Sequence, residues 1–262
     1  MARERVWEYG PDGLAETGPP AVGGELRAVG GAIEVADSWL VEDGRVRSLE
    51  GHRRRFAAGV REVSGRDVTD FWDAVVAQLP REGDWFPRVE LAGGTLRLRL
   101  RGTPERTRTV RLWPTYEDPR RAPRRKGPDL AALGGLITRA RSEGADNALL
   151  LSPEGLVLEA ATATLVWWEG PQLCVVDPEL PVLEGVTAGW IVARAAALGV
   201  PVRTRRARPA ELDGCETWVV NALHGIRAVT GWSGAGVTAG PATRAQEWHE
   251  AWLASAEPLP PR

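Results

Sequence analysis

The sequence predicts an α+β fold in two parts that are joined by a proline-rich connector. The first part alternates strand-like runs with two helical stretches, and the second repeats this mixture with more strands. Between them, residues 114–125 (PTYEDPRRAPRR) contain three prolines and no hydrophobic periodicity. We therefore expect a small N-terminal domain over residues 1–113, a linker over 114–125 and a larger domain over 126–262.

The first part begins with strand-like runs and then turns helical. Asp43-Gly44 separates two of these runs and is typical of a hairpin turn. Residues 50–62 have the pattern of a helix, and Asp67 is placed to cap a second helix that ends at Ala77. The predicted strands of this part lie at 25–29, 32–36, 38–49, 87–93, 95–102 and 108–113, and 95–102 alternates strictly.

The second part opens with a helix over 128–143, with Pro128 near its start. Further helices are predicted over 187–198, ended by Gly199, and at the surface over 242–254. We expect the tail 257–262 to be loose. The predicted strands of this part lie at 145–152, 155–160, 164–170, 172–176, 201–207 and 217–223.

The composition excludes several classes of function. A net charge of −2 and a pI near 6.0 are unlike a nucleic-acid-binding domain, whose pI usually exceeds ~9. No apolar run approaches the ~18–20 residues of a membrane-spanning helix, and the N-terminus lacks the apolar run of a signal peptide. Two cysteines provide neither a disulfide framework nor a zinc site. We expect a cytoplasmic protein with a small-molecule substrate and no metal, nucleic-acid or membrane partner.

The basic residues are distributed unusually. Lysine and arginine total 33, and only Lys126 is a lysine. A guanidinium stays charged and is not a nucleophile, whereas a lysine amine can lose its proton and form an imine with a carbonyl compound. Lys126 is therefore a candidate for covalent chemistry. Composition alone gives equal support to the alternative that Lys126 is an ordinary lysine, left by chance in the basic run RRAPRRK.

Three other places could contact a phosphorylated cofactor, each with an ordinary alternative. The segment Leu183–Thr187 runs into a helix whose first N–H groups could bind an anion, although Thr187 could equally cap that helix. Glu159 ends a strand and, if buried, needs a partner, which could be a protonated pyridine nitrogen or an arginine. Arg55 lies on a helix whose basic face could simply be solvated.

Taken in order, these motifs resemble the fold-type IV pyridoxal phosphate family, which includes class IV aminotransferases and aminodeoxychorismate lyases. The resemblance covers about residues 25–255 and implies the two-domain fold of D-amino-acid aminotransferase. The segments that carry it are DSWLVEDG (37–44), HRRR (52–55), Lys126 before a helix, GADNALLL (144–151), EGLVLE (154–159), LEGVT (183–187) and WVVNAL (218–223).

The resemblance implies a role for each matching residue. Lys126 would form the Schiff base with pyridoxal 5′-phosphate and act as general acid and base, and Glu159 would hold the pyridine nitrogen. The implied phosphate contacts are Arg55, Gly185, Val186, Thr187, Asn221 and Ala222. The chain departs from the family at Ala163-Thr164, where an asparagine is usual, so Thr164 would have to replace that cofactor contact, and at Ala188, where an arginine is frequent.

The triplet Asn221-Ala222-Leu223 looks more like aminodeoxychorismate lyases than like branched-chain or D-amino-acid aminotransferases. The resemblance therefore implies a lyase that converts 4-amino-4-deoxychorismate to 4-aminobenzoate and pyruvate, as in folate synthesis, with a class IV aminotransferase as the alternative. A cofactor-free binding homologue is a third hypothesis. Ser38, His224 and Arg227 are the candidate substrate contacts, although a core hydroxyl and two surface residues would explain them equally. Relatives of this kind are usually homodimers.

Overall fold

The computed structural model describes residues 4–17 and 31–261, which form two compact units. The first unit comprises Met1–Glu105, Arg125–Pro128 and Ser255–Arg262, and the second comprises Arg106–Arg124 and Asp129–Ala254. This division differs from the predicted one, because the short segment around Lys126 and the C-terminal tail both belong to the first unit. The predicted strand at 25–29 lies outside the described residues.

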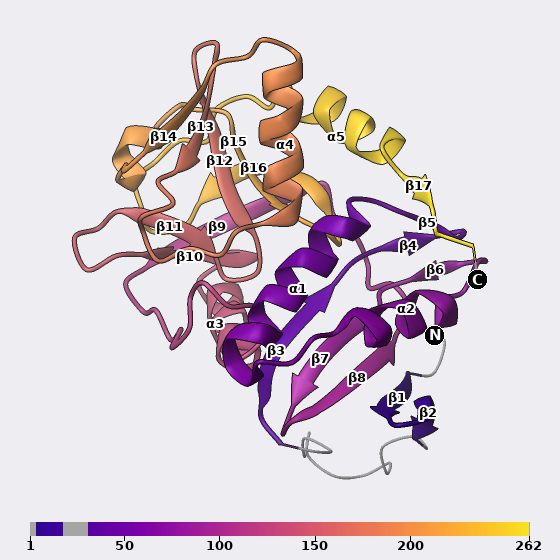
Figure 1. Ribbon diagram of the computed structural model, residues 1–262. Coiled ribbons are helices and arrows are strands. Elements are labelled where there is room, and N and C mark those ends of the chain that lie inside the picture. Colours follow the sequence, from indigo (N-terminus) through magenta and orange to yellow (C-terminus); the bar gives the residue numbers. More distant parts are fainter. Residues whose placement is uncertain (1–3, 18–30, 262) are drawn as a thin grey trace. The chain divides into compact units, whose positions relative to one another are not determined.

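The first unit is built on an antiparallel five-stranded sheet (Figure 1). In spatial order its strands are β2 (Gly13–Thr17), β1 (Arg5–Gly10), β8 (Thr95–Leu100), β7 (Arg88–Ala92) and β3 (Ile33–Ser38). The alternation in β8 sends Leu96, Leu98 and Leu100 into the core and its arginines to the opposite face. β1 and β2 were not predicted from the sequence.

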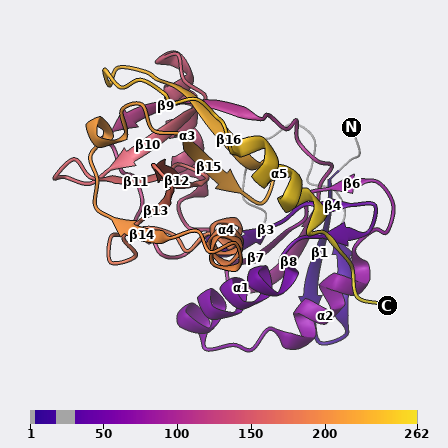
Figure 2. The same cartoon turned by 90° about the horizontal axis from the view of Figure 1, so that it is seen from above.

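Two helices cover the apolar face of this sheet, α1 (Leu49–Ser64) and α2 (Thr69–Gln78) (Figure 2). Phe56 and Val60 of α1 and Phe71 of α2 are almost fully buried, which is the one-sided burial expected of an amphipathic helix. The Asp67 carboxylate accepts a hydrogen bond from the Thr69 N–H at 2.7 Å, but the N-cap residue of α2 is Val68 and not Asp67 as predicted.

A second, small sheet of the first unit has the order β17 (Glu257–Pro258), β5 (Arg45–Val46), β4 (Val41–Glu42) and β6 (Asp84–Trp85). Asp43 and Gly44 join β4 to β5 with φ values of 45° and 69°, so the hairpin predicted there is confirmed. The prediction of a loose C-terminal tail is wrong. β17 pairs with β5, and the Leu259 N–H donates to the Gly44 carbonyl at 2.8 Å.

The second unit contains an eight-stranded mixed sheet. In spatial order its strands are β11 (Val157–Ala160), β10 (Asn147–Leu151), β9 (Thr109–Thr115), β16 (Gly225–Trp232), β15 (Thr217–Asn221), β12 (Thr164–Glu169), β13 (Gln172–Val176) and β14 (Val202–Arg205). The strand predicted at 108–113 is therefore part of this sheet, not of the first sheet. It runs parallel to both β10 and β16, a long-range pairing that local pattern does not reveal. β16 was not predicted.

Apolar side chains fill both faces of this sheet. One face packs against α4 (Val186–Ala197) and α5 (Ala245–Ala254), where Trp168, Trp218 and Trp248 make edge or tilted ring contacts. The other face has its own core around Leu149, Leu165 and Trp167. α3 (Leu130–Ser142) packs against Ala148 and Leu150 of β10, which point away from that core. α5 was predicted as a surface helix, but Trp248, His249 and Trp252 on it are buried. A 3₁₀ turn, η1, spans Pro209–Leu212.

None of the helices within 4–17 and 31–261 combines the length and the apolar character needed to cross a membrane.

Candidate active site

Lys126 follows the proline-rich connector and is attached to β3 through its backbone. The Lys126 carbonyl accepts a hydrogen bond from the Ala36 N–H at 2.7 Å. Gly127 has a φ of 135°, and a Cβ there would lie 2.6 Å from the Ala36 nitrogen. Only glycine allows the chain to pass so close to the strand in this conformation. The connector thus ends with Lys126 fixed beside Asp37.

Asp37 is the centre of the polar cluster around Lys126. Its carboxylate is fully buried and accepts two hydrogen bonds from the Arg55 guanidinium, at 2.8 and 2.7 Å. His52 Nδ1 lies 2.9 Å from Asp37 Oδ1, and the Lys126 Nζ lies 3.5 Å from the same oxygen. The sequence motif placed Asp37 in this block but did not assign it a role. Buried cations need an anionic partner, and this carboxylate contacts two cationic side chains, Arg55 and Lys126, as well as His52.

The electrostatics of the cluster favour a reactive amine at Lys126. Burial lowers the pKa of Lys126 to about 8, and the Arg55 charge adds to this effect, whereas Asp37 opposes it. The Arg55, Lys126 and His52 charges hold the pKa of the Asp37 carboxyl well below its usual range, against the effect of burial. Burial also lowers the pKa of His52, which favours its neutral form. The carboxylate is thus ionised, while the lysine amine can lose its proton near neutral pH.

Glu159, in the second unit, lies on β11 with 7% of its surface exposed. Its carboxylate pairs with Arg120 and accepts a hydrogen bond from the Leu183 N–H at 3.3 Å. Arg120 also pairs with Asp118 at 2.6 Å. Burial raises the pKa of Glu159 to about 7, although the Arg120 charge opposes this. The arginine that we considered as the alternative partner of Glu159 is thus present, and sequence analysis did not identify it as Arg120.

The segment before α4 is packed tightly at Gly185. A Cβ on Gly185 would lie 2.2 Å from the Thr164 Oγ1, so Thr164, at the start of β12, lies directly against this segment. Gly185, not Thr187, is the residue that precedes α4, and the helix has no side-chain cap. The capping role considered for Thr187 is therefore wrong. Its hydroxyl is buried and has no hydrogen-bond partner among the described residues.

Asn221 shapes the turn between β15 and β16. Its side-chain oxygen accepts hydrogen bonds from the N–H groups of Leu223 and His224, at 3.1 and 2.8 Å. Its amide group donates to the Thr162 carbonyl at 3.2 Å. Ala222 is therefore held between two fixed points of this turn, and the side chain of Asn221 is engaged by protein groups.

The three candidate substrate contacts belong to different units. Ser38 ends β3 in the first unit, is buried, and donates its N–H to Asp37 Oδ1 at 2.7 Å. His224 and Arg227 lie together in the second unit, where the charges of Arg227 and Arg106 add to burial and lower the pKa of His224 to about 4. Arg227 has 6% of its surface exposed, so the surface location considered for it is wrong.

These side chains fit pyridoxal 5′-phosphate as a ligand. Among the described residues, Thr187 offers a buried hydroxyl without a partner, and Gly185 lets the chain enter α4 in close contact with Thr164, whose Oγ1 would lie 2.2 Å from a Cβ at Gly185. Both features suit a phosphate at a helix N-terminus. Lys126 supplies an amine that can lose its proton, and Glu159 supplies a buried carboxylate. Within the described ranges, no group of three or more His, Cys, Asp and Glu side chains is arranged to hold a metal ion.

Comparison with known proteins shows the family of the chain. The profile of the family described as amino-transferase class IV matches residues 34–232. No curated protein sequence matches the chain.

Solved structures resemble the fold closely. A hypothetical aminotransferase from Mycobacterium tuberculosis with bound α-ketoglutarate and PMP has a TM-score of 0.79 and 21% identity, over 96% of this chain and 98% of that chain. A branched-chain aminotransferase from Thermoproteus uzoniensis gives 0.77 and 17%, over 98% and 99%. A Legionella pneumophila protein described as "Putative 4-amino-4-deoxychorismate lyase" gives 0.72 and 15%, over 84% and 90%. The predicted fold class is confirmed.

Proposed function

Because the chain belongs to the class IV aminotransferase family, and so to the fold-type IV enzymes that use pyridoxal phosphate, we propose that it is an aminodeoxychorismate lyase. In this reaction 4-amino-4-deoxychorismate gives 4-aminobenzoate and pyruvate, with no second substrate. The observation that carries the enzymatic part of the proposal is Lys126. It is the sole lysine of the chain, and its amine has a pKa lowered to about 8 beside a buried carboxylate.

Each residue has a defined task in this proposal. Lys126 would hold pyridoxal phosphate covalently and, as a free amine, would move a proton between substrate positions as general base and acid. When bound, the cofactor provides an electron sink for the negative charge that develops on the substrate. Glu159 keeps the pyridine nitrogen protonated. A carboxylate oxygen can accept more than one hydrogen bond, so Glu159 can serve this nitrogen while it remains paired with Arg120.

The proposed phosphate contacts are Arg55, Thr164, Gly185, Val186, Thr187, Asn221 and Ala222. Of these, Thr187 has the strongest support, because a buried hydroxyl without a partner is costly unless a ligand satisfies it. Arg55 is engaged with Asp37 through two of its nitrogens, which fixes the orientation of its guanidinium.

One feature supports the lyase over the aminotransferase, and a second supports a carboxylate-bearing substrate for either reaction. The Asn221-Ala222-Leu223 triplet is similar to that of aminodeoxychorismate lyases, and its asparagine fixes the turn that leads to His224 and Arg227. Arg227 is a buried cation, no described carboxylate forms an ion pair with it, and its Nε has no described hydrogen-bond partner. Burial lowers its pKa to about 10. Such a group favours an anionic ligand, and the proposed substrate carries two carboxylates.

The second candidate function is a class IV aminotransferase for branched-chain or D-amino acids. It is supported by the similarity of the fold to the Mycobacterium tuberculosis protein that was solved with α-ketoglutarate and PMP. Under either function we propose a homodimer, which light scattering of the purified protein would test.

The first experiment tests the cofactor. Purified protein loaded with pyridoxal phosphate should show a visible absorption band that Lys126→Ala abolishes and that Lys126→Arg does not restore, because a guanidinium cannot form the bond. Glu159→Gln should keep the covalent attachment but lower turnover by at least about tenfold, since a neutral amide does not favour a protonated pyridine nitrogen. A colourless wild-type protein that takes up no cofactor would favour the cofactor-free homologue.

The second experiment tests the reaction. The loaded enzyme is given 4-amino-4-deoxychorismate, and the formation of 4-aminobenzoate is followed by its fluorescence and that of pyruvate by a coupled assay. The lyase predicts both products in equal amounts without a 2-oxo acid. Turnover of an amino acid with 2-oxoglutarate, together with no 4-aminobenzoate, would instead establish the aminotransferase.

A further inference from the structure

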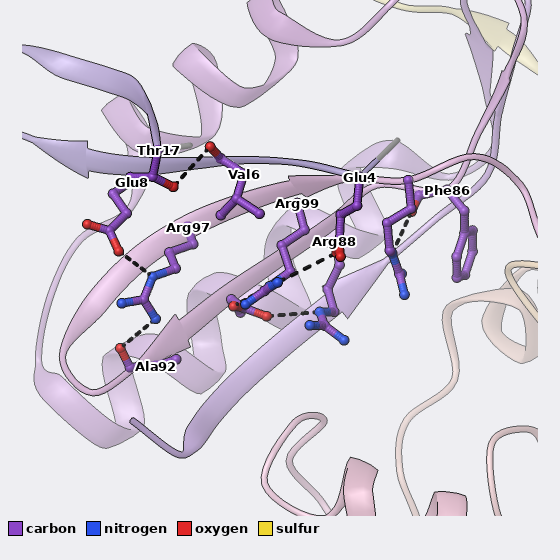
Figure 3. A network of polar contacts seen from close by, with 11 residues as sticks. Glu4, Val6, Glu8, Thr17, Phe86, Arg88, Ala92, Arg97 and Arg99 are labelled. Carbon is purple, nitrogen blue, oxygen red and sulfur yellow. Dashed lines mark hydrogen bonds and ion pairs between the residues drawn. The ribbon is translucent and has the colours of Figure 1, made fainter. Parts of the chain in front are cut away.

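Three arginines follow one another at alternate positions of the strand that ends beside the Lys126 cluster. Arg97 and Arg99 belong to β8, and Arg101 follows directly after it. Because side chains alternate across a strand, Arg97 and Arg99 share the face opposite the apolar core (Figure 3). The same alternation puts Arg101 in line with them. Arg88 and Glu90, from the neighbouring strand β7, contribute to the same network.

The first two arginines are neutralised by carboxylates. Arg97 pairs with Glu8 at 2.8 Å. Arg99 pairs with Glu90 at 2.8 Å and lies 3.6 Å from Glu4 (Figure 3). Glu90 in turn accepts a hydrogen bond from Arg88 at 2.9 Å. The charges of this polar face are therefore largely balanced up to position 99.

Arg101 is bound differently. Its Nε donates to the Phe86 carbonyl at 3.3 Å, and its guanidinium lies over the Phe86 ring at 5.2 Å from the centroid. The Phe86 N–H donates to the Arg101 carbonyl at 2.8 Å, which fixes the two residues side by side. No carboxylate in the described part of the chain forms an ion pair with this guanidinium. A guanidinium that is rigidly held, partly buried and not paired with a carboxylate can bind the carboxylate of a ligand through two parallel hydrogen bonds.

The sheet register places Arg101 near the Lys126 cluster, because Ser38, next to Asp37, pairs with Arg88, and Arg88 pairs with Arg99. The Arg101 charge is one of the groups that lower the pKa of Lys126. Burial, together with the neighbouring Arg88 charge, lowers the pKa of Arg101 itself to about 10, so the cation is held at a cost that a bound anion would relieve. The buried hydroxyl of Thr103, two residues further on, has no hydrogen-bond partner among the described residues and could donate to the same anion.

We propose that Arg101 binds a carboxylate of the substrate whose amine reacts at Lys126. The inference rests on the proposed function only in requiring that a substrate reacts at this lysine. Both candidate reactions use carboxylate-bearing substrates, so Arg101 serves either of them. Since it touches the substrate away from the bonds that change, its contribution is to affinity and orientation.

The experiment compares two probes of nearly the same shape, 4-aminobenzoate and its neutral counterpart 4-aminobenzamide. Calorimetry measures their dissociation constants for the cofactor-loaded protein. The wild type should bind the carboxylate about tenfold more tightly, or better, and Arg101→Gln should remove this preference while leaving the affinity for the amide nearly unchanged. Arg101→Lys, which keeps the charge but loses the fork, should give an intermediate preference.

Arg5→Gln is the matched control. Arg5 lies on β1 opposite Leu100, so its side chain points to the other face of the sheet from that of Arg101. It is 51% exposed and paired with Glu16, and its replacement changes the net charge equally. The preference for the carboxylate should survive in this variant. A wild type that binds both probes alike, or an Arg101→Gln protein that keeps the preference, would overturn the proposal. If Arg101→Gln fails to fold, the Arg101→Lys protein takes its place, and a full wild-type preference in that protein would also overturn the proposal.

Two further measurements distinguish a failure of this inference from a failure of the proposed function. The visible absorption band reports the bond between Lys126 and the cofactor, and the same probe comparison is repeated with 2-oxoglutarate against its neutral diester. If Arg101→Gln loses the preference for the carboxylate in both pairs of probes and keeps the absorption band, the result supports carboxylate binding by Arg101, whether the enzyme is a lyase or an aminotransferase. The wild-type protein could also lack lyase activity. If its Arg101→Gln variant then still preferred 2-oxoglutarate over the diester, this result would contradict the inference about Arg101 independently of the proposed function.

Discussion

At the scale of single residues, Asp37 determines the properties of Lys126. One fully buried carboxylate contacts an arginine, a histidine and the lysine, and all four groups lie in the first unit. Its negative charge raises the pKa of Lys126, whereas burial and the Arg55 charge lower it. The balance leaves the amine with a pKa of about 8, low enough to react and high enough to accept a proton afterwards.

This balance predicts the pH dependence of cofactor attachment. The free amine is the nucleophile. The rate at which the unloaded protein takes up pyridoxal phosphate should therefore rise with pH, and the midpoint of this rise should lie at about pH 8. Asp37→Asn removes the one anion that raises the pKa of Lys126, and the midpoint should therefore move to lower pH. Stopped-flow absorbance of the developing visible band measures the profile.

Asp37→Glu is the control, because it retains the negative charge and should restore a midpoint near that of the wild type. The asparagine variant also leaves Arg55 without its anion, so its stability will fall, but stability alone does not move the midpoint of a rate profile. An Asp37→Asn midpoint equal to that of the wild type would show that Asp37 has only a structural role.

At the scale of elements, two glycines in and next to α4 differ in their surroundings, and this difference allows the proposed phosphate site to be tested apart from helix stability. Gly185 precedes the helix, and a Cβ there would lie 2.2 Å from the Thr164 Oγ1. Gly189 lies inside the same helix with nothing within 4 Å of a Cβ. Gly185→Ala should therefore weaken pyridoxal phosphate binding by at least about tenfold, since Thr164 or the phosphate segment must shift.

Gly189→Ala should instead stabilise the protein by about 0.5–1 kcal/mol, because alanine is the better helix former, and should leave cofactor affinity unchanged. Spectrophotometric titration with the cofactor and urea unfolding measure the two effects. Equal cofactor affinity in both variants would remove Gly185 from the proposed phosphate site.

The elements also show what the sequence can and cannot predict. Helices and hairpins follow from local pattern, so α1, α4 and the Asp43-Gly44 turn agree closely with prediction. β9 has the same local pattern as a strand of the first sheet, yet it pairs with β10 and β16. Long-range pairing depends on side chains far apart in sequence. For the same reason, Arg120 and Arg101 gave no signal among so many arginines, whereas the sole lysine did.

At the scale of the whole molecule, the first unit is assembled from three separate pieces of the chain. Arg125–Pro128 and Ser255–Arg262 join it after long excursions through the second unit. The tail is held by the β17–β5 pairing, and the Arg81 guanidinium donates to the Pro260 carbonyl at 2.7 Å. A charged, proline-rich tail gives little sign of order in its sequence, because its partners Gly44 and Arg81 come from distant positions.

The tail therefore predicts a measurable contribution to stability. Leu259 is buried with 5% of its surface exposed, and Leu259→Ala should lower the free energy of unfolding by about 2 kcal/mol, because the substitution removes buried apolar surface and leaves a cavity. Leu253, which is 37% exposed on α5, is the matched control, and Leu253→Ala should change stability by less than about 0.5 kcal/mol. Urea unfolding followed by tryptophan fluorescence gives both values. If the two variants were equally stable, the tail would not be an integral part of the first unit.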